Sequence, residues 1–185
     1  MKESFLFLAD GFEEIEALTA VDVLRRAGIS LRTVSISGKL DVVGAHGITV
    51  KADELFDSEK TKDAAWLILP GGMPGASNLH DFTPLVELLK RQKDSKEGRI
   101  AAICAAPAVV LGAEGLLRGR KATCYPGFEA DLLGAEYTGQ PVVSDDKFVL
   151  GNGPANALRW SLEIVSQACG ADKSEEVASQ MLLNS

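Results

Sequence analysis

The chain is poor in the residues on which most metal and nucleophilic chemistry depends. Its 185 residues include two histidines, His46 and His80, and three cysteines, Cys104, Cys124 and Cys169. Because only two imidazoles are available, a histidine-rich metal site is nearly excluded, and any cysteine–histidine pair must use one of them. An odd cysteine count without CxxC spacing also argues against a disulfide framework and a thiol–disulfide oxidoreductase.

Long apolar runs and basic clusters are also missing. The first apolar run, residues 5–9, stops at Asp10, which is too short for a signal-peptide core or a membrane span. Lys and Arg together number 19 against 26 Asp and Glu, so the net charge is −7. This balance disfavours binding to nucleic acid or to an anionic membrane. We expect a cytoplasmic protein with no membrane or nucleic-acid partner.

The composition is that of a folded globular domain. Hydrophobic residues make up 46% of the chain and charged residues 24%, and this mixture is typical of a single core rather than of disorder. No linker, repeat or low-complexity segment interrupts the pattern. We therefore expect residues 1–185 to form one domain.

Short apolar runs alternate with helical patterns. Strands are expected at residues 4–8, 31–36, 65–69, 99–103, 121–124, 136–138, 142–144 and 148–150. Helices are expected at 13–27, from Thr83 as N-cap with Pro84 as the first helical residue, around 107–114, and at 156–169 and 174–183, and residues 38–57 are expected to form a hairpin-and-loop region. Such alternation predicts an α/β fold with a mostly parallel sheet covered on both faces.

Three segments are expected where parallel strands end and ligands gather: residues 10–16, 70–75 and 104–107. In the last of these, an apolar strand leads straight into Cys104 and then into small residues that can begin a helix. A sharp strand-to-helix turn exposes a nucleophile, and helix N–H groups aimed at it stabilise a thiolate and lower the thiol pKa. The alternative is a buried cysteine that ends a core strand, as we also expect for Cys124 and Cys169.

Glu16 lies in the first of these segments, on an apolar face of the expected helix. The residues that share this face are Ala20, Val23, Leu24 and Ala27. Desolvation should raise the pKa of such a carboxyl, so that it can hold a proton and pass it on. The alternative is a glutamate near the helix start that simply reaches solvent. Glu13 and Glu14 are explained by the positive end of the helix.

The remaining segments give weaker signals. Three glycines in residues 70–75 allow main-chain N–H groups to converge on an anion, although the ending typical of a nucleotide-binding loop is missing. His80 lies in a polar stretch that reads as a loop, and His46 lies between glycines. Both are expected to be solvated surface residues.

Taken together and in this order, these segments resemble the ThiJ/PfpI superfamily, in the branch that contains YajL and the parkinsonism-associated protein deglycase. The resemblance covers nearly the whole chain. It is carried by Gly-Phe-Glu-Glu-Ile-Glu-Ala at 11–17, Val-Asp-Val-Leu-Arg-Arg-Ala-Gly-Ile at 21–29, Leu-Pro-Gly-Gly at 69–72, Ala-Ala-Ile-Cys-Ala-Ala-Pro at 101–107, Gly-Pro at 153–154 and Glu-Val-Ala-Ser-Gln at 176–180.

The resemblance implies a flavodoxin-like three-layer sandwich, a homodimer and no cofactor or metal. It implies that Cys104 is the nucleophile at a strand-to-helix elbow and that Glu16 is a protonated carboxyl bonded to its sulfur. The main-chain N–H groups of Gly72 and Ala105 would form an oxyanion pocket. Tyr125 and His46 are further candidates to line the pocket.

Two departures from the family pattern narrow the chemistry. Members with amidase or protease-like activity carry a histidine downstream of the cysteine, and the matching position here is Tyr125. A Ser-Arg pair found in some relatives is Ala45-His46 here. The first departure makes a cysteine–histidine dyad improbable and disfavours a peptidase or amidase.

Two functions of different classes therefore remain. The first is a stress-protective enzyme of glyoxalase or deglycase type, in which Cys104 attacks 2-oxoaldehydes or their adducts on proteins or nucleotides and Glu16 moves the proton. Its partners would be a small aldehyde or a glycated adduct. The alternative is a non-enzymatic redox sensor or chaperone that acts through oxidation of Cys104.

Overall fold

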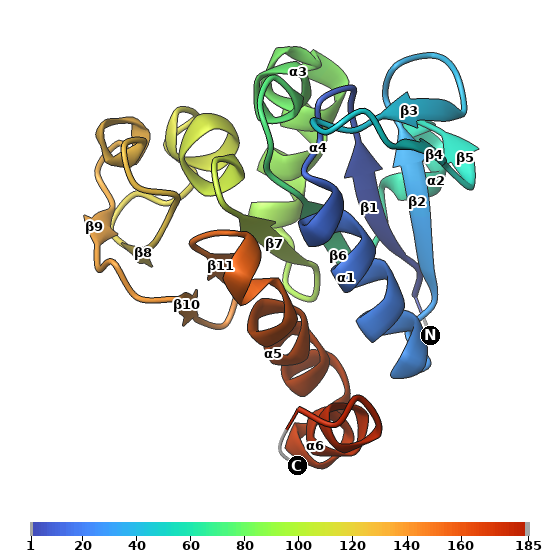
Figure 1. Ribbon diagram of the computed structural model, residues 1–185. Helices are drawn as coiled ribbons and strands as arrows, with labels where there is room; N and C mark the ends of the chain where they lie inside the picture. Colours follow the sequence, from blue (N-terminus) through green and yellow to red (C-terminus); the bar gives the residue numbers. More distant parts are fainter. Residues whose placement is uncertain (1, 184–185) are drawn as a thin grey trace.

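A computed structural model describes residues 2–183. A seven-stranded sheet in the order β10-β11-β7-β6-β1-β2-β5 runs through the centre of the molecule (Figure 1). Its strands are β1 (Ser4–Leu8), β2 (Leu31–Ser35), β5 (Glu54–Leu55), β6 (Trp66–Leu69), β7 (Arg99–Ile103), β10 (Val142–Ser144) and β11 (Phe148–Gly151). Neighbouring strands are parallel except β10 and β11, which are antiparallel. The predicted α/β fold with a mostly parallel sheet is confirmed.

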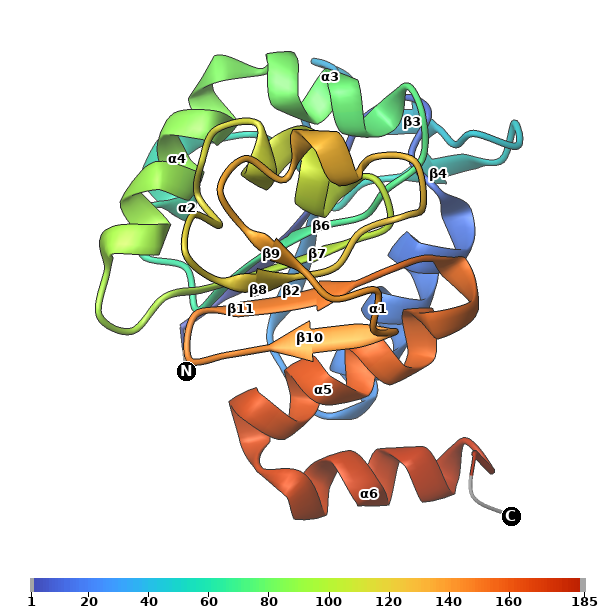
Figure 2. The same ribbon diagram turned by 90° about the vertical axis from the view of Figure 1, so that its left-hand side faces the viewer.

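Helices cover both faces of this sheet, which makes three layers (Figure 2). One face is covered by α1 (Glu14–Arg26), α5 (Ala157–Cys169) and α6 (Ala171–Gln180), and the other by α3 (Gly75–Asp81), α4 (Thr83–Asp94) and the π-helix η1 (Pro107–Gly112). The short α2 (Ser58–Thr61) contacts α4. Among residues 2–183, no helix combines the length and apolar character needed to cross a bilayer.

Two small sheets and two short 3-10 helices lie outside the central sheet. The antiparallel pair β3 (Asp41–Val43) and β4 (Thr49–Lys51) forms a hairpin, as expected for residues 38–57. The parallel pair β8 (Lys121–Ala122) and β9 (Glu136–Tyr137) lies beyond η1. The 3-10 helices are η2 (Glu129–Asp131) and η3 (Pro154–Asn156).

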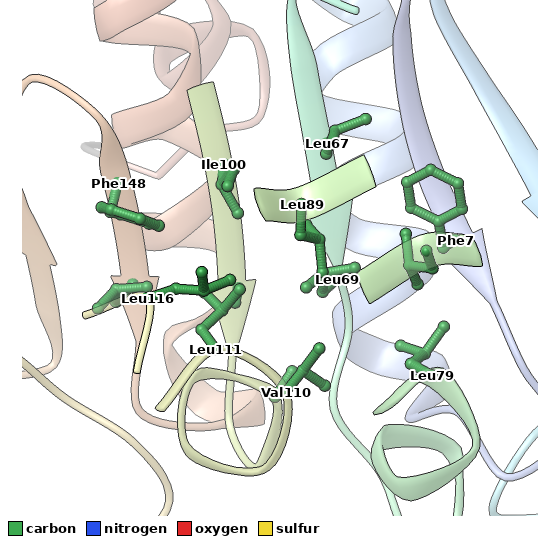
Figure 3. Close-up of a cluster of buried hydrophobic side chains, with 14 of the residues drawn as sticks. Phe7, Leu67, Leu69, Leu79, Leu89, Ile100, Val110, Leu111, Leu116 and Phe148 are labelled. Atoms are coloured by element: carbon green, nitrogen blue, oxygen red, sulfur yellow. The ribbon is translucent and has the colours of Figure 1, made fainter. Parts of the chain in front are cut away.

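A hydrophobic cluster fills the space on each side of the sheet. Alternate residues of one strand point to opposite faces, so Phe5 and Phe7 belong to one cluster while Leu6 and Leu8 belong to the other. Figure 3 shows the cluster under α3, α4 and η1, where Leu79 and Leu89 meet strand residues. Strands that are buried on both faces have continuous apolar sequences, and this is why the sequence predicts them.

Three local expectations were wrong. Helix α4 begins at Thr83, with Phe82 in the N-cap position, so Thr83 is not the cap. The polar stretch that contains His80 is helix α3, because Ala76 and Leu79, three residues apart, give it a buried side. Cys169 is exposed at the end of α5 rather than in the core, whereas Cys124 is buried as expected.

Trp160 packs α5 against the sheet, and its contacts predict how a substitution there changes the free energy of unfolding. It is fully buried, and its indole N–H donates a hydrogen bond to the carbonyl of Val149 at 3.0 Å. Replacing Trp160 with Phe removes this bond and part of the buried surface, so the free energy of unfolding should fall by about 2 kcal/mol. Urea denaturation measures the loss. The adjacent exposed Arg159, replaced by Ala, is the control, and equal midpoints for the two variants would contradict the assignment.

Candidate functional site

The three predicted segments meet at the carboxyl ends of β1, β6 and β7. A Cβ atom on Gly71 would lie 2.6 Å from Cβ of Cys104 and 2.8 Å from Oε2 of Glu16. A Cβ atom on Gly11 would lie 2.5 Å from Cδ of Pro74. Contacts this short exclude any side chain at either position, so the glycines allow the three loops to close on one another. The expected convergence is confirmed.

Cys104 occupies a sharp turn between β7 and the helical segment that follows. Its φ of +65° lies in the left-handed region, which side-chain-bearing residues rarely adopt. Two main-chain bonds hold the turn: Cys104 N–H donates to the carbonyl of Gly151 at 2.9 Å, and the Cys104 carbonyl accepts from Tyr125 N–H at 2.8 Å. Unlike the buried Cys124, Cys104 is partly accessible. Strained turns of this kind cluster at functional sites.

The carboxyl of Glu16 is buried beside this turn. Glu16 is 0% exposed, and its Oε2 accepts a hydrogen bond from Gly71 N–H at 2.7 Å. Its other oxygen, Oε1, is buried without a hydrogen-bond partner among residues 2–183. The burial predicted from the apolar helix face is therefore confirmed, and the side chains of Glu16 and Cys104 interact directly.

Burial shifts the pKa values of both groups upward. It raises the pKa of Glu16 from 4.5 to about 7, as expected for a carboxyl on an apolar face. Burial and the negative charge of Glu16 raise the pKa of the Cys104 thiol from 9.0 to about 12. The expected net lowering of the thiol pKa is therefore wrong. The N–H groups of Ala105 and Gly72 do lower it, but burial and the carboxylate charge outweigh them.

Those two N–H groups mark a place where negative charge is favoured. Both act on the sulfur of Cys104, one from the residue that follows it and one from the loop after β6. Gly72 has a φ of +87°, and a Cβ atom there would lie 2.4 Å from the main-chain nitrogen of Glu13. The site thus offers two main-chain donors from different elements beside a thiol, which is the arrangement an oxyanion requires.

His46 lies near the first turn of α1 but is bonded to Glu14. Its Nδ1 is 2.8 Å from Oε2 of Glu14, and its main-chain N–H donates to Oε1 at 2.8 Å. Burial alone would raise the pKa of Glu14, but the hydrogen bonds from His46 lower it below its usual value. The side chain of His46 is 68% exposed, as expected. The sequence did not indicate that Glu14 is buried, because the positive end of the helix already accounted for an acidic residue at this position.

Glu13, Glu14 and His46 are also the residues that could offer ligand atoms to a metal. One atom from each lies within 4.8 Å of the others. The bonds between His46 and Glu14 account for this proximity without an ion. We assign no metal to the group.

The second histidine lies elsewhere and has its own partner. Nε2 of His80 is 3.1 Å from Oε1 of Glu114, and its side chain is about two-thirds buried, which corrects the expectation of a solvated residue.

Tyr125 lies next to the turn at Cys104. Its main-chain N–H donates to the Cys104 carbonyl, and the residue is 45% exposed. A Cβ atom on Gly153 would lie 3.4 Å from the Tyr125 ring. The expectation that Tyr125 lies near Cys104 thus agrees with its main-chain contact.

Comparison with known proteins gives a consistent result. The sequence profile of the DJ-1/PfpI family matches residues 2–167. Protein DJ-1 homolog B of Arabidopsis thaliana is 36% identical over 98% of the chain, which spans 42% of that longer protein. A protein of Pyrococcus horikoshii named a deglycase is 33% identical over 89% of the chain and 98% of its own length. The structure of oxidized Toxoplasma gondii DJ-1 superposes with a TM-score of 0.93 at 34% identity and covers 98% of both chains.

The buried Glu16 predicts a pH dependence of stability. Its pKa is higher in the folded chain, about 7, than the ordinary 4.5. The folded state therefore binds more protons than the unfolded state between these values, and stability falls as pH rises, by at most ~1.4 kcal/mol per pH unit. Urea denaturation from pH 5 to pH 8 should show this fall in the wild type and a flatter profile in Glu16→Gln. Replacing the exposed Glu175 with Gln is the control; parallel profiles for wild type and Glu16→Gln would contradict the assignment.

Proposed function

Because the chain belongs to the DJ-1/PfpI family, we propose that it is a stress-protective, cofactor-free cysteine enzyme that acts on 2-oxoaldehydes or their adducts. The observation that carries this proposal is the Cys104–Glu16 pair: a cysteine at a φ of +65° and a buried carboxyl, both in contact range of Gly71. The relative named a deglycase supports the same substrate class. The family relationship also supports a stress-related role.

The first step is addition of the Cys104 sulfur to the aldehyde carbon of methylglyoxal. The thiol proton passes to the Glu16 carboxylate, whose Oε1 has no other hydrogen-bond partner among the described residues. The carbonyl oxygen then carries the negative charge and is stabilised by the N–H groups of Gly72 and Ala105. A thiol whose pKa is raised needs such a base, because little thiolate is present at neutral pH.

The second step moves a proton between neighbouring carbons. Glu16 first gives the proton it took from the thiol to the oxyanion, which yields a hemithioacetal and restores the carboxylate. The carboxylate then removes the proton from the former aldehyde carbon and returns it to the adjacent carbon, while the hydroxyl proton on the first carbon moves to the oxygen on the second. The first carbon is oxidised to a thioester while the second is reduced to an alcohol, so no external oxidant is needed. Water then hydrolyses the thioester, which releases lactate and restores the thiol. On a carbinolamine adduct, the C–N bond breaks as the Cys104 sulfur binds the same carbon, and the amine leaves with the proton that Glu16 took from the thiol; the resulting hemithioacetal then follows the same sequence.

Oxidation of Cys104 is the second candidate function. Cys104 is accessible, and the Glu16 carboxyl beside it could donate a hydrogen bond to a sulfinate oxygen at pH values where it is protonated. Mild peroxide should then add two oxygens to Cys104, which peptide mass spectrometry can locate. The exposed Cys169 supplies the internal comparison. Oxidation confined to Cys169 or Cys124 would remove this candidate.

A homodimer and a cytoplasmic location complete the proposal. Ile15 and Leu18 of α1 and Ile48 before β4 are exposed, and apolar side chains gathered near one face suit burial against a second copy.

All three cysteines are free, which suits a reducing compartment. A peptidase is disfavoured, because no hydrogen bond among residues 2–183 joins either imidazole to Cys104; Nδ1 of His46 binds Glu14 and Nε2 of His80 binds Glu114.

The enzymatic proposal is tested by removing the nucleophile. Cys104→Ser should lower the rate of lactate formation from methylglyoxal to less than about one hundredth of the wild-type rate. Glu16→Gln should lower it as well, while Cys104 still reacts with iodoacetamide. Cys169→Ser is the matched control and should keep the wild-type rate. Equal rates for Cys104→Ser and Cys169→Ser would sink the proposal.

A further inference from the structure

A cavity lies at the opposite end of the sheet from Cys104. It has a volume of about 190 Å³, and its lining includes Lys2, Ser4, Trp66, Glu97, Arg99 and Gln167. Three of these stand at the amino ends of β1, β6 and β7, the same strands whose carboxyl ends carry the site described above. Because β7 has five residues at about 3.3 Å each, the two sites are separated by roughly 16 Å.

The polar side chains of this cavity form a row across adjacent strands. Trp66 is paired with Arg99 in the parallel register, and Phe5 is paired with Leu67, which places Ser4 level with Trp66. Since alternate residues share a face, the three side chains of this row all point toward the layer of α1 and α5. They therefore meet at one place, with the last turn of α5 above them.

Arg99 is fixed in position but lacks a counter-charge. Its guanidinium carbon lies 5.7 Å from the centre of the Trp66 ring, and its Nη1 donates to the neutral amide oxygen of Gln167. Among residues 2–183, no carboxylate forms an ion pair with it, although the chain carries 26 acidic residues. A partly buried guanidinium held by an aromatic ring and an amide retains donors that no anion satisfies.

Ser4 gives an independent sign of a ligand. It is 0% exposed, and its Oγ has no hydrogen-bond partner among the described residues. Buried hydroxyls are almost always hydrogen-bonded, because an unpaired one costs free energy. Lys2 adds a second cation at the mouth, and its ion pair with Glu97, at 2.8 Å, is exposed on both sides and thus weak enough to exchange.

We propose that this cavity binds a phosphate-type oxyanion, either inorganic phosphate or a phosphomonoester. Arg99 would supply the guanidinium fork, Ser4 the hydroxyl donor and Lys2 the second positive charge. A doubly charged anion matches two cations, and its several oxygens can accept from donors on separate elements. The volume exceeds the ~30 Å³ share of one water several times over, which leaves room for a small anion. The site needs neither Cys104 nor Glu16.

Titration calorimetry with inorganic phosphate at constant ionic strength tests the proposal. The wild type should bind one equivalent, Arg99→Met should lose at least about tenfold in affinity, and Ser4→Ala should lose severalfold. Arg91→Met, which removes an exposed arginine from α4, is the matched control and should bind like the wild type. A phosphomonoester titration shows whether the mouth admits an attached organic group. Alkylation of Cys104 at the wild-type rate reports that each variant is folded.

Three results would overturn the assignment. The first is no phosphate binding by the wild type, which would mean that the cavity holds only water. The second is equal binding by wild type and Arg99→Met, which would place the anion elsewhere. The third is a preference for acetate over phosphate, which would replace the phosphate-type ligand with a carboxylate. Because the readout is binding rather than turnover, none of these results bears on the proposed enzyme activity.

Discussion

The close approach of Gly71 to both Cys104 and Glu16 is the constraint on which the site depends. A glycine there leaves the space that a Cβ atom would fill open to a carboxyl and a cysteine side chain, and its N–H group binds the carboxyl. Any side chain would separate the strand ends. The loop after β6 therefore does two things: it brings α1 and the β7 turn together, and it presents the N–H group of Gly72 to the same sulfur.

The electrostatics of the pair follow from this enclosure. Burial raises the pKa of both groups, and a negative charge on one disfavours a charge on the other. Burial thus favours the protonated form of each group, and each lies beside a partner that can exchange a proton with it. The strained turn at Cys104 fits this arrangement, because it keeps the sulfur accessible while the carboxyl remains inside.

The two ends of the sheet differ in charge. The carboxyl ends gather Glu13, Glu14 and Glu16 with one imidazole, whereas the amino ends of the same strands gather Arg99 and Lys2 around a buried hydroxyl. Lys2 is paired there with Glu97, so Arg99 is the cation of this cavity that has no carboxylate partner among residues 2–183. The two groups of residues are separated along β7, and no residue belongs to both.

The sequence by itself determined the strand and helix pattern, the placement of Cys104 after β7 and the apolar face that buries Glu16, because period and composition report burial directly. It did not reveal helix α3 or the exposure of Cys169, because short amphipathic segments and element ends depend on neighbours. Only the tertiary structure decided the direction in which the Cys104 pKa shifts and the bond between His46 and Glu14. It also decided that Arg99 has no carboxylate partner among residues 2–183. Each of these depends on the distance between residues far apart in the chain, and a charge or a donor is satisfied only by what folding places beside it.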